Sequence, residues 1–341
     1  MHRILIIAPN WIGDAVMSQP FLAALQLNYP KAQIDVLATP WVAPIYRACE
    51  QIHEVIEAPL EHKKLQWSLR KKIAQSLKKQ SYQACFVLPN SFKSALIPWL
   101  SNIPFRLGYR GEARFGLINF ALPNPSKMQR PPMVERYLDL IDLLDHENPQ
   151  DSEYPQAPQL KLSSKIIHAT RDKLEHANIN QDSLYVFCPG AEYGVTKRWP
   201  AESFAELAKK VLAQNAQAQI ILLGSQNDHH LGQMIAGQDT GRIHNWCGKT
   251  SLEEAMTIIS LCNSVVSNDS GLMHIAAALQ KPQIAIFGSS DPRHTPPLSD
   301  KAKIIWLNLP CSPCHHRECP LGHLKCLTEI SPEQVFNSLT I

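Results

Sequence analysis

The sequence predicts an α/β fold built from two Rossmann-like domains. Short apolar runs of strand length alternate with helix-like segments along most of the 341 residues. The alternation stops at 146–161, in a stretch rich in Pro, Gln and acidic residues, and then starts again. A chain of this length also suits two domains of ordinary size. We therefore expect an N-terminal domain at 1–150 and a C-terminal domain at 162–341, facing each other across a cleft.

The first half supplies the elements of one parallel sheet. We expect helices between its strands, on both faces of the sheet. The expected strands are 3–8, 33–38, 53–57, 84–88 and 104–108, and the expected helices are 14–28, 41–49, 65–80 and 91–100.

The second half repeats the architecture without repeating the sequence. Strands are expected at 184–190, 218–225, 241–246, 264–269 and 282–290, with helices at 200–214, 228–237, 251–262 and 271–280. We find no G-x-G-x-x-G and no G-x-x-x-x-G-K-[ST] in the chain, which argues against dinucleotide-binding and P-loop proteins.

Composition and charge exclude several classes of protein. A hydrophobic content of 45% supports real cores, and a net charge of +3 is too mild to predict nucleic-acid binding. No stretch approaches the roughly 20 apolar residues of a membrane span. The apolar run after Arg3 is too short for a signal peptide. We therefore expect a cytosolic protein whose nine cysteines are thiols or metal ligands.

The first strand-to-helix turn, "APNWIGDAVMSQP" at 8–20, carries an acid where nucleotide-binding folds usually hold phosphate. It contains a single glycine, Gly13, followed by Asp14. An acid is stable at a helix N-terminus but repels a phosphate bound there. Asp14 is therefore either a helix cap or a functional carboxylate, and both roles are compatible.

An anion site is predicted at "VVSNDSGLMHIAAAL", residues 265–279. A buried strand ends at Asp269, and Ser270 and Gly271 open a helix with His274 one turn along. Free N–H groups at such a helix start, together with the helix dipole, attract anions. The alternative is an ordinary Asp or Ser cap with a packing glycine.

Two further loops follow strands of the second half. "CPGAEYGVTKRWP" at 188–200 carries Lys197, which suits a diphosphate, although a solvated basic loop is the alternative. "LLGSQNDHH" at 222–230 offers Asp228 to a ribose hydroxyl, or as a helix cap. Ligands of open α/β sheets bind at the carboxyl ends of strands, so we expect the second domain to hold a nucleotide diphosphate.

Three of these segments, "PNWIGDAVMSQP", "PGAEYGVTKRWP" and "NDSGLMHIAAAL", resemble the heptosyltransferases of lipopolysaccharide inner-core synthesis. The resemblance covers nearly the whole chain and implies the GT-B glycosyltransferase fold. It implies ADP-L-glycero-β-D-manno-heptose as donor. The first motif resembles the branch of the family that adds the second heptose, to the first heptose of Hep-Kdo2-lipid A. The alternatives are another core heptosyltransferase (I or III), a GT-B nucleotide-sugar 2-epimerase, or a sensor of sugar nucleotides without activity.

The resemblance also implies roles for residues. Asp14 matches the family's catalytic base, and an inverting reaction by a single displacement needs only one general base. The donor-binding positions are Lys197 for the phosphates, Asp228 for the adenosine, Thr250 near the nucleotide, and Asp269, Ser270, Gly271 and His274 for the phosphates and heptose. The chain contains no Asp-x-Asp, so we expect no cofactor and no divalent metal in the site.

A basic segment is the candidate acceptor surface. Residues 60–136 contain 14 Lys or Arg against 3 Asp or Glu. Such a surface attracts both an acceptor that carries phosphates and Kdo carboxylates, as the family implies, and an anionic membrane. We select Arg106, Arg110 and Arg114 for the acceptor, whereas the helix at 63–79 is equally explained as a solvated face. The expected location is peripheral, on the cytoplasmic face of the inner membrane of a Gram-negative bacterium.

The last motif is "CSPCHHRECPLGHLKC", with Cys311, Cys314, Cys319 and Cys326 spaced C-x2-C-x4-C-x6-C. Four cysteines in a cytosolic protein suit a structural Zn²⁺. The second pair is not a C-x-x-C, so the match is loose. We favour reduced thiols in a compact loop over zinc, and both over a disulfide.

Overall fold

The computed structural model describes residues 1–61, 63–125, 131–144, 154–237 and 239–339. The chain divides into two compact units, unit 1 (Met1–Leu160) and unit 2 (Lys161–Ile341). The expected linker at 146–161 spans this division, although its residues 146–153 lie outside the described part. In the described part, no helix is both long and apolar enough to cross a membrane.

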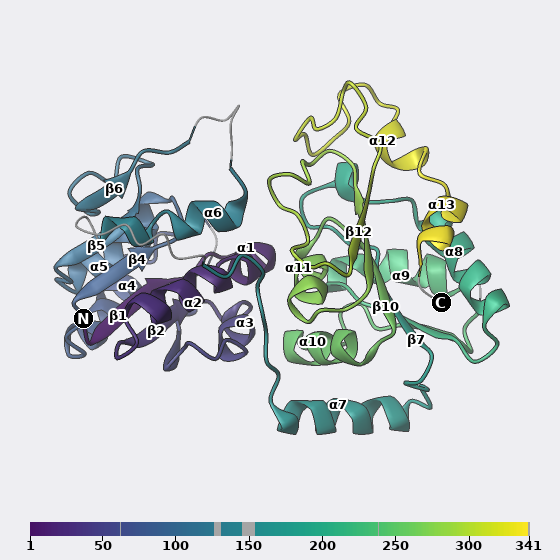
Figure 1. The fold of residues 1–341 in the computed structure, drawn as a ribbon, viewed down its shortest axis with the longest axis horizontal. Coiled ribbons are helices and arrows are strands. Elements are labelled where there is room, and N and C mark those ends of the chain that lie inside the picture. The colour runs from purple at the N-terminus through teal and green to yellow at the C-terminus, as the bar shows by residue number, and fades with distance from the viewer. Residues whose placement is uncertain (62, 126–130, 145–153, 238, 340–341) are drawn as a thin grey trace. The chain divides into compact units, whose positions relative to one another are not determined.

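Unit 1 is a six-stranded parallel sheet with helices on both faces (Figure 1). Helices α4 and α5 pack together on one face, and α1, α2, α3 and α6 pack together on the other. Its strands are β1 (Arg3–Ile7), β2 (Gln33–Ala38), β3 (Glu54–Glu57), β4 (Ala84–Val87), β5 (Phe105–Tyr109) and β6 (Phe120–Leu122). Its helices are α1 (Ile12–Met17), α2 (Gln19–Asn28), α3 (Ala43–Arg47), α4 (Trp67–Lys78), α5 (Leu96–Leu100) and α6 (Met133–Leu138), with short 3₁₀ helices η1 (Phe92–Ala95) and η2 (Ile141–Leu143).

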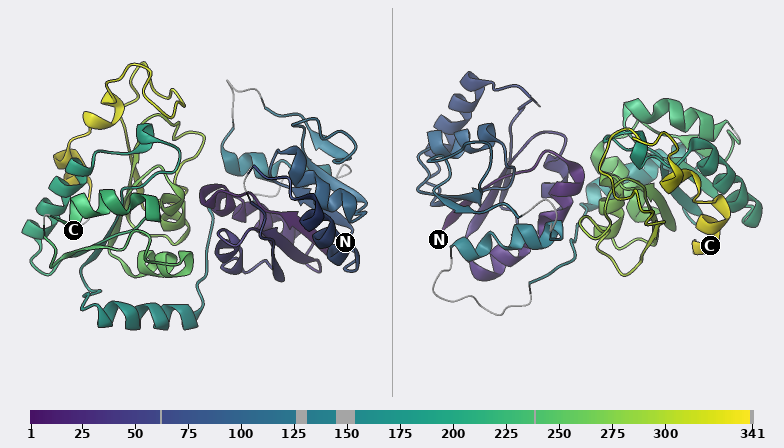
Figure 2. Two further views of the ribbon diagram at one scale, coloured as in Figure 1. Left: turned by 180° about the vertical axis from the view of Figure 1, so that it is seen from behind. Right: turned by 90° about the horizontal axis from the view of Figure 1, so that it is seen from above.

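Unit 2 has the same layered construction, as Figure 2 shows from two further directions. Helices α8, α9 and α13 pack on one face of its sheet, and α7, α10 and α11 on the other. The strands are β7 (Leu184–Cys188), β8 (Gln219–Leu222), β9 (Ile243–Asn245), β10 (Ser264–Asn268), β11 (Gln283–Phe287) and β12 (Ala302–Trp306). The helices are α7 (Ser164–His176), α8 (Ala201–Gln214), α9 (His229–Ala236), α10 (Leu252–Leu261), α11 (Gly271–Ala278), α12 (Lys325–Thr328) and α13 (Pro332–Ser338), with η3 (Val195–Lys197) and η4 (Gln226–Asp228).

The predicted fold class is confirmed: each unit is a doubly wound parallel α/β sheet. The strand orders are β3-β2-β1-β4-β5-β6 and β12-β11-β10-β7-β8-β9. In both units the first strand therefore lies between the second and the fourth, which is the Rossmann order. The order reverses between β1 and β4 in unit 1 and between β7 and β10 in unit 2. Ligands of such folds bind at this switch point, at the carboxyl ends of the strands.

Each expected strand and helix range contains an element of the expected type, but some boundaries and short elements differ. The helix expected at 14–28 is two helices, because Pro20 has no N–H with which to continue the hydrogen bonds of the first. Strands β6 and β12 were not predicted. Both lie at sheet edges: β6 is only three residues long, and Lys303 interrupts the apolar run of β12.

Buried aromatic side chains fix the sheets against their helices. Phe86 of β4 meets Phe21 of α2 edge to face, with ring centroids 5.0 Å apart. In unit 2, Trp199 packs edge to face on Phe204 of α8 at 4.9 Å, and its indole N–H donates to the carbonyl of Ile330 at 2.9 Å. Such pairs add about 0.5–1.5 kcal/mol beyond the burial of their area. Trp199 thereby fixes the C-terminal end of the loop that carries Lys197.

Candidate active site

The loops after β7 and β10 bring two predicted donor-site residues together at the switch point of unit 2. Lys197 ends η3, and Asp269 directly follows β10. The Lys197 Nζ lies 2.5 Å from the Asp269 Oδ2, and the same oxygen accepts a hydrogen bond from the hydroxyl of Ser290. The Asp269 carboxylate is nearly buried, whereas the lysine side chain is 20% exposed. The lysine expected to hold phosphate is therefore neutralised by a carboxylate in this structure.

The start of α11 lies beside this ion pair. Ser270 occupies the N-cap position, but its side chain makes no capping hydrogen bond, so it leaves the first-turn N–H groups to other partners. His274 is buried one turn along, and burial lowers its pKa to about 4, with Lys197 adding to the effect and Asp269 opposing it. At neutral pH the imidazole is therefore uncharged.

A second wall of the site comes from the cysteine-containing segment, which sequence reasoning did not connect with the donor. The Tyr193 hydroxyl donates to the carbonyl of His315 at 2.6 Å, and the Thr196 hydroxyl donates to that of His316. Lys197 Nζ and the Arg317 guanidinium each lie 5.3 Å from the Tyr193 ring centroid. Ser290 was also missed. It follows β11 in the run "FGSS", and the signal was a small polar pair directly after a buried strand.

The structure gives Asp228 a local role. Its Oδ2 accepts hydrogen bonds from the Ser225 backbone N–H at 2.9 Å and the Ser225 hydroxyl at 2.7 Å, which caps η4. A Cβ at Gly190 would lie 2.3 Å from its carboxylate carbon, so the loop after β7 packs directly on this side chain. Asp228 also occupies the N-cap position of α9, but its side chain makes no capping hydrogen bond there, so it is not the helix N-cap of the alternative interpretation. Contact with adenosine stays a prediction.

Thr250 follows β9, the edge strand next to β8. It is half-buried and directly precedes Ser251, which caps α10. The nearby Gly248 N–H donates to the carbonyl of Gly224 at 3.0 Å, so this segment runs against the loop after β8. Its role near the nucleotide also stays a prediction.

Asp14 lies in the first turn of α1, at the switch point of unit 1. The N-cap position is Trp11, whose side chain makes no capping hydrogen bond. Asp14 is half-buried and lies near two buried phenols, Tyr46 and Tyr137. Burial raises the pKa of both tyrosines, and the negative charge of Asp14 raises it further. Asp14 is thus not the N-cap residue that the alternative interpretation proposed.

The three arginines selected for the acceptor differ sharply in their surroundings. Arg106 donates to the carbonyls of Ile103, Leu117 and Gly116. Arg114 is only 3% exposed and donates to Pro89 O at 2.6 Å, Asn90 Oδ1 at 3.1 Å and Tyr109 O. These two guanidinium groups therefore fasten loops of unit 1 to one another. Arg110 is exposed and is the better acceptor candidate of the three.

The cysteine segment contains four free thiols. Cys326 is buried, and the other three are partly exposed. Within the described ranges, only Asp35, His53 and Glu54 bring three possible ligand atoms within 4.8 Å of one another, so these cysteines form no such group. Asp35 itself is fully buried and bound to Arg3 and Tyr82, as a structural network at the amino ends of β1 and β2.

Two doubly wound α/β units, each with charged residues at its switch point, define a GT-B-like protein, and the family match identifies it as a glycosyltransferase. The sequence profile of glycosyltransferase family 9 (heptosyltransferase) matches residues 70–325, and the chain belongs to this family. It is 40% identical to the lipopolysaccharide heptosyltransferase 2 of Salmonella typhimurium, over 99% of this chain and 97% of that protein. It is 39% identical to the Escherichia coli protein of the same name, with equal coverage. The solved structure of E. coli ADP-heptose lipopolysaccharide heptosyltransferase II superposes with a TM-score of 0.85, at 38% identity, over 98% of this chain and 97% of that one.

Proposed function

We propose that this protein transfers L-glycero-D-manno-heptose from ADP-heptose to the first heptose of the lipopolysaccharide inner core, with inversion. The observation that carries the proposal is the arrangement at the switch point of unit 2, where Lys197, Asp269 and the start of α11 adjoin one another. Relatives at 38–40% identity over nearly the whole chain, all named heptosyltransferase 2 or II, support the choice of donor and acceptor.

In the proposed donor site, Lys197 exchanges its contact with Asp269 for the diphosphate of ADP-heptose. The N–H groups at the start of α11 bind further phosphate oxygens. Both groups stabilise the negative charge that develops on ADP as it leaves. Asp228 and Thr250 contact the nucleoside, and Ser270, Gly271 and the uncharged His274 contact the phosphates and heptose. These residues supply the charge stabilisation without a divalent cation.

In the proposed reaction, Asp14 is the general base. It takes the proton of the acceptor hydroxyl while that oxygen forms a bond with the anomeric carbon of heptose. The bond from that carbon to the phosphate oxygen breaks, and ADP leaves from the opposite face. A single displacement of this kind converts the β-linked donor into an α-linked product.

The acceptor carries anionic groups and is anchored in a membrane. We propose that unit 1 binds it, and that the exposed Arg110 and the basic α4 contribute to attraction by an anionic surface. The protein then works at the cytoplasmic face of the inner membrane as a peripheral protein.

The test is to supply purified protein with ADP-heptose and three acceptors: Kdo2-lipid A, its mono-heptosylated form and its di-heptosylated form. We expect mass spectrometry to show one added heptose on the mono-heptosylated acceptor alone, and EDTA to leave the rate unchanged. Transfer to Kdo2-lipid A or to the di-heptosylated acceptor would instead identify heptosyltransferase I or III, and release of free epimerised sugar would identify an epimerase. A strict and reversible Mg²⁺ requirement would contradict the metal-free donor site.

A further inference from the structure

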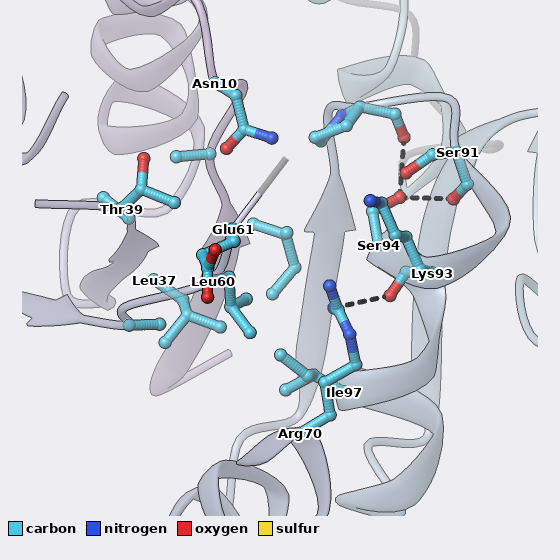
Figure 3. A pocket seen from close by; sticks show the side chains of 15 residues that line it. Asn10, Leu37, Thr39, Leu60, Glu61, Arg70, Ser91, Lys93, Ser94 and Ile97 are labelled. Atoms are coloured by element: carbon cyan, nitrogen blue, oxygen red, sulfur yellow. Dashed lines mark hydrogen bonds between the residues drawn. The ribbon is translucent and has the colours of Figure 1, made fainter. Parts of the chain in front are cut away.

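Unit 1 contains a cavity at its own switch point. Its volume is about 40 Å³, and residues at the carboxyl ends of β1, β2, β3 and β4 line it together with Arg70 of α4. Figure 3 shows Asn10 and Thr39 on one side of it, and Ser91, Lys93 and Arg70 on the other. A water needs about 10–15 Å³, so the cavity has room for roughly three waters, or for one small group with two or three oxygens. Asn10 belongs to the loop that leads into α1, which carries Asp14.

The cavity has more positive charge than the described residues balance. Arg70 is 3% exposed, and its Nε and Nη1 donate only to backbone carbonyls, those of Leu65 at 2.6 Å and Lys93 at 2.8 Å. In the described part of the chain, no carboxylate pairs with Arg70 or Lys93. Glu61 also lines the cavity, but the Nζ of Lys64 lies 2.5 Å from its carboxylate.

A buried hydroxyl group at the same cavity also has no partner. Thr39 is 5% exposed and lines the cavity, and its Oγ1 has no hydrogen-bond partner among the described residues. Buried charges and buried hydroxyl groups both cost free energy unless they are paired. A guanidinium, an ammonium and a free hydroxyl around one small space share one ideal partner, a compact anion whose oxygens accept from all three.

We propose that this cavity is a subsite for an anionic group of the acceptor, a phosphate or a carboxylate. The proposal rests on the proposed function, because the acceptor must carry that group. Lys93 and Arg70 neutralise the anion, and the Thr39 hydroxyl donates to one of its oxygens. The hydroxyl of Ser91 and the amide of Asn10 lie at the same cavity and suit neighbouring sugar oxygens. The subsite thereby positions the acceptor beside the loop and helix that present Asp14.

Two substitutions separate binding from folding. Lys93→Gln removes one charge and should raise the acceptor KM about tenfold, the loss expected for one charge-assisted contact. Thr39→Val keeps the shape and removes only the unpartnered hydroxyl. It should raise the acceptor KM several-fold while the Tm stays equal or rises. In both variants the KM for ADP-heptose and the kcat at saturating acceptor should stay within about twofold of wild type. The matched control is Lys31→Gln, an exposed lysine just before the amino end of β2, which should change nothing.

A binding experiment identifies the anion. With ADP saturating unit 2, we expect added inorganic phosphate or acetate to raise the Tm of wild type but not of Lys93→Gln. A response to phosphate alone assigns the subsite to a phosphate group, and a response to acetate alone assigns it to a carboxylate. Unchanged acceptor KM in both variants, or equal Tm shifts in wild type and Lys93→Gln, would overturn the subsite. If wild type transferred heptose to no acceptor, the proposed function would fail, whereas the anion-dependent Tm shift would still report on the cavity.

Discussion

The two units share one strand order but treat the charge at their switch points differently. In unit 2 two cations are paired with carboxylates. The Lys197 Nζ lies 2.5 Å from the Asp269 Oδ2, and the Arg198 Nη2 lies 3.7 Å from the Asp228 Oδ1. In unit 1, within the described residues, Arg70 and Lys93 line a cavity with no carboxylate partner of their own. The carboxyl edge of the sheet therefore has paired charges in unit 2, whereas the cavity at the corresponding edge of unit 1 is cationic.

This difference has a physical consequence for binding. In the proposed donor site of unit 2, a phosphate that binds Lys197 displaces Asp269, so part of its attraction offsets the loss of an existing ion pair. An anion that enters the cavity of unit 1 meets cations that donate to backbone carbonyls and have no carboxylate partner among the described residues, so it does not have to break an ion pair. The donor site is therefore expected to be selective, because only a ligand that also satisfies the α11 amides compensates for the lost pair. The cavity of unit 1 is expected to accept any small anion that fits.

The largest effect is expected at Asp14, the acidic residue in the first turn of α1. Asp14→Asn keeps the size and the helix but removes the base, and general-base catalysis contributes a factor of about 10²–10⁴. We expect kcat to fall by that factor, with ADP affinity and Tm close to wild type. Steady-state rates, calorimetry and thermal unfolding measure the three quantities. Asp172→Asn, an exposed acid on α7, is the control for loss of one charge. Near wild-type turnover in Asp14→Asn would place the base elsewhere.

A smaller effect is expected from breaking the ion pair of unit 2. Lys197→Ala should weaken ADP binding by about 1.5–3 kcal/mol, roughly 10- to 150-fold, because it removes a charge-assisted contact and leaves the Asp269 carboxylate near the phosphate. Adding Asp269→Asn to Lys197→Ala should recover part of the loss, since the repulsion is gone. Calorimetry with ADP measures both.

The matched control is the exposed ion pair of Lys210 and Glu333, whose nitrogen and oxygen are 2.6 Å apart. Lys210→Ala should leave ADP affinity unchanged. If Lys197→Ala and the double variant both bound ADP with wild-type affinity, the nucleotide would not bind at this edge of unit 2.

The loops at both switch points could be predicted from the sequence, because their positions depend on local patterns of residues. Buried strands that end in small or polar residues identified the loops carrying Asp14, Lys197 and Asp269. The sequence could not predict what each charge touches. Arg114 and Arg106 resemble surface cations in sequence, but their guanidinium groups bind carbonyls up to 25 residues away, which only the tertiary fold brings near.

Other misses have the same origin. The contact between Tyr193 and the carbonyl of His315 joins residues 122 apart in the chain, and no local pattern encodes it. The cavity beside Arg70 and Thr39 combines five segments, of which sequence reasoning had singled out only the first loop and the basic helix. The spacing of the four cysteines can be read from the sequence, but how close their sulfur atoms lie to one another depends on the tertiary fold.

The last effect concerns stability rather than binding and is expected at His274, the buried histidine of α11 in unit 2. Burial lowers its pKa from 6.5 to about 4 in the folded protein. Between these values the unfolded chain binds a proton that the folded protein does not. The stabilisation from the neutral imidazole is therefore complete above about pH 6.5 and is lost progressively as the pH falls toward 4. At pH 5 the loss should be about 2 kcal/mol relative to neutral pH.

Chemical denaturation of wild type and His274→Gln at pH 7.5 and pH 5 measures this loss. The variant is expected to be less stable at both pH values, because it disturbs a buried site. The quantity that tests the prediction is the difference between the two pH values, which should be about 2 kcal/mol smaller in the variant. His176→Gln, at an exposed histidine of α7, should keep the wild-type pH dependence. If wild type and His274→Gln lost equal stability between pH 7.5 and 5, His274 would take up its proton in the folded protein as readily as in the unfolded chain, and its burial would not keep the imidazole uncharged.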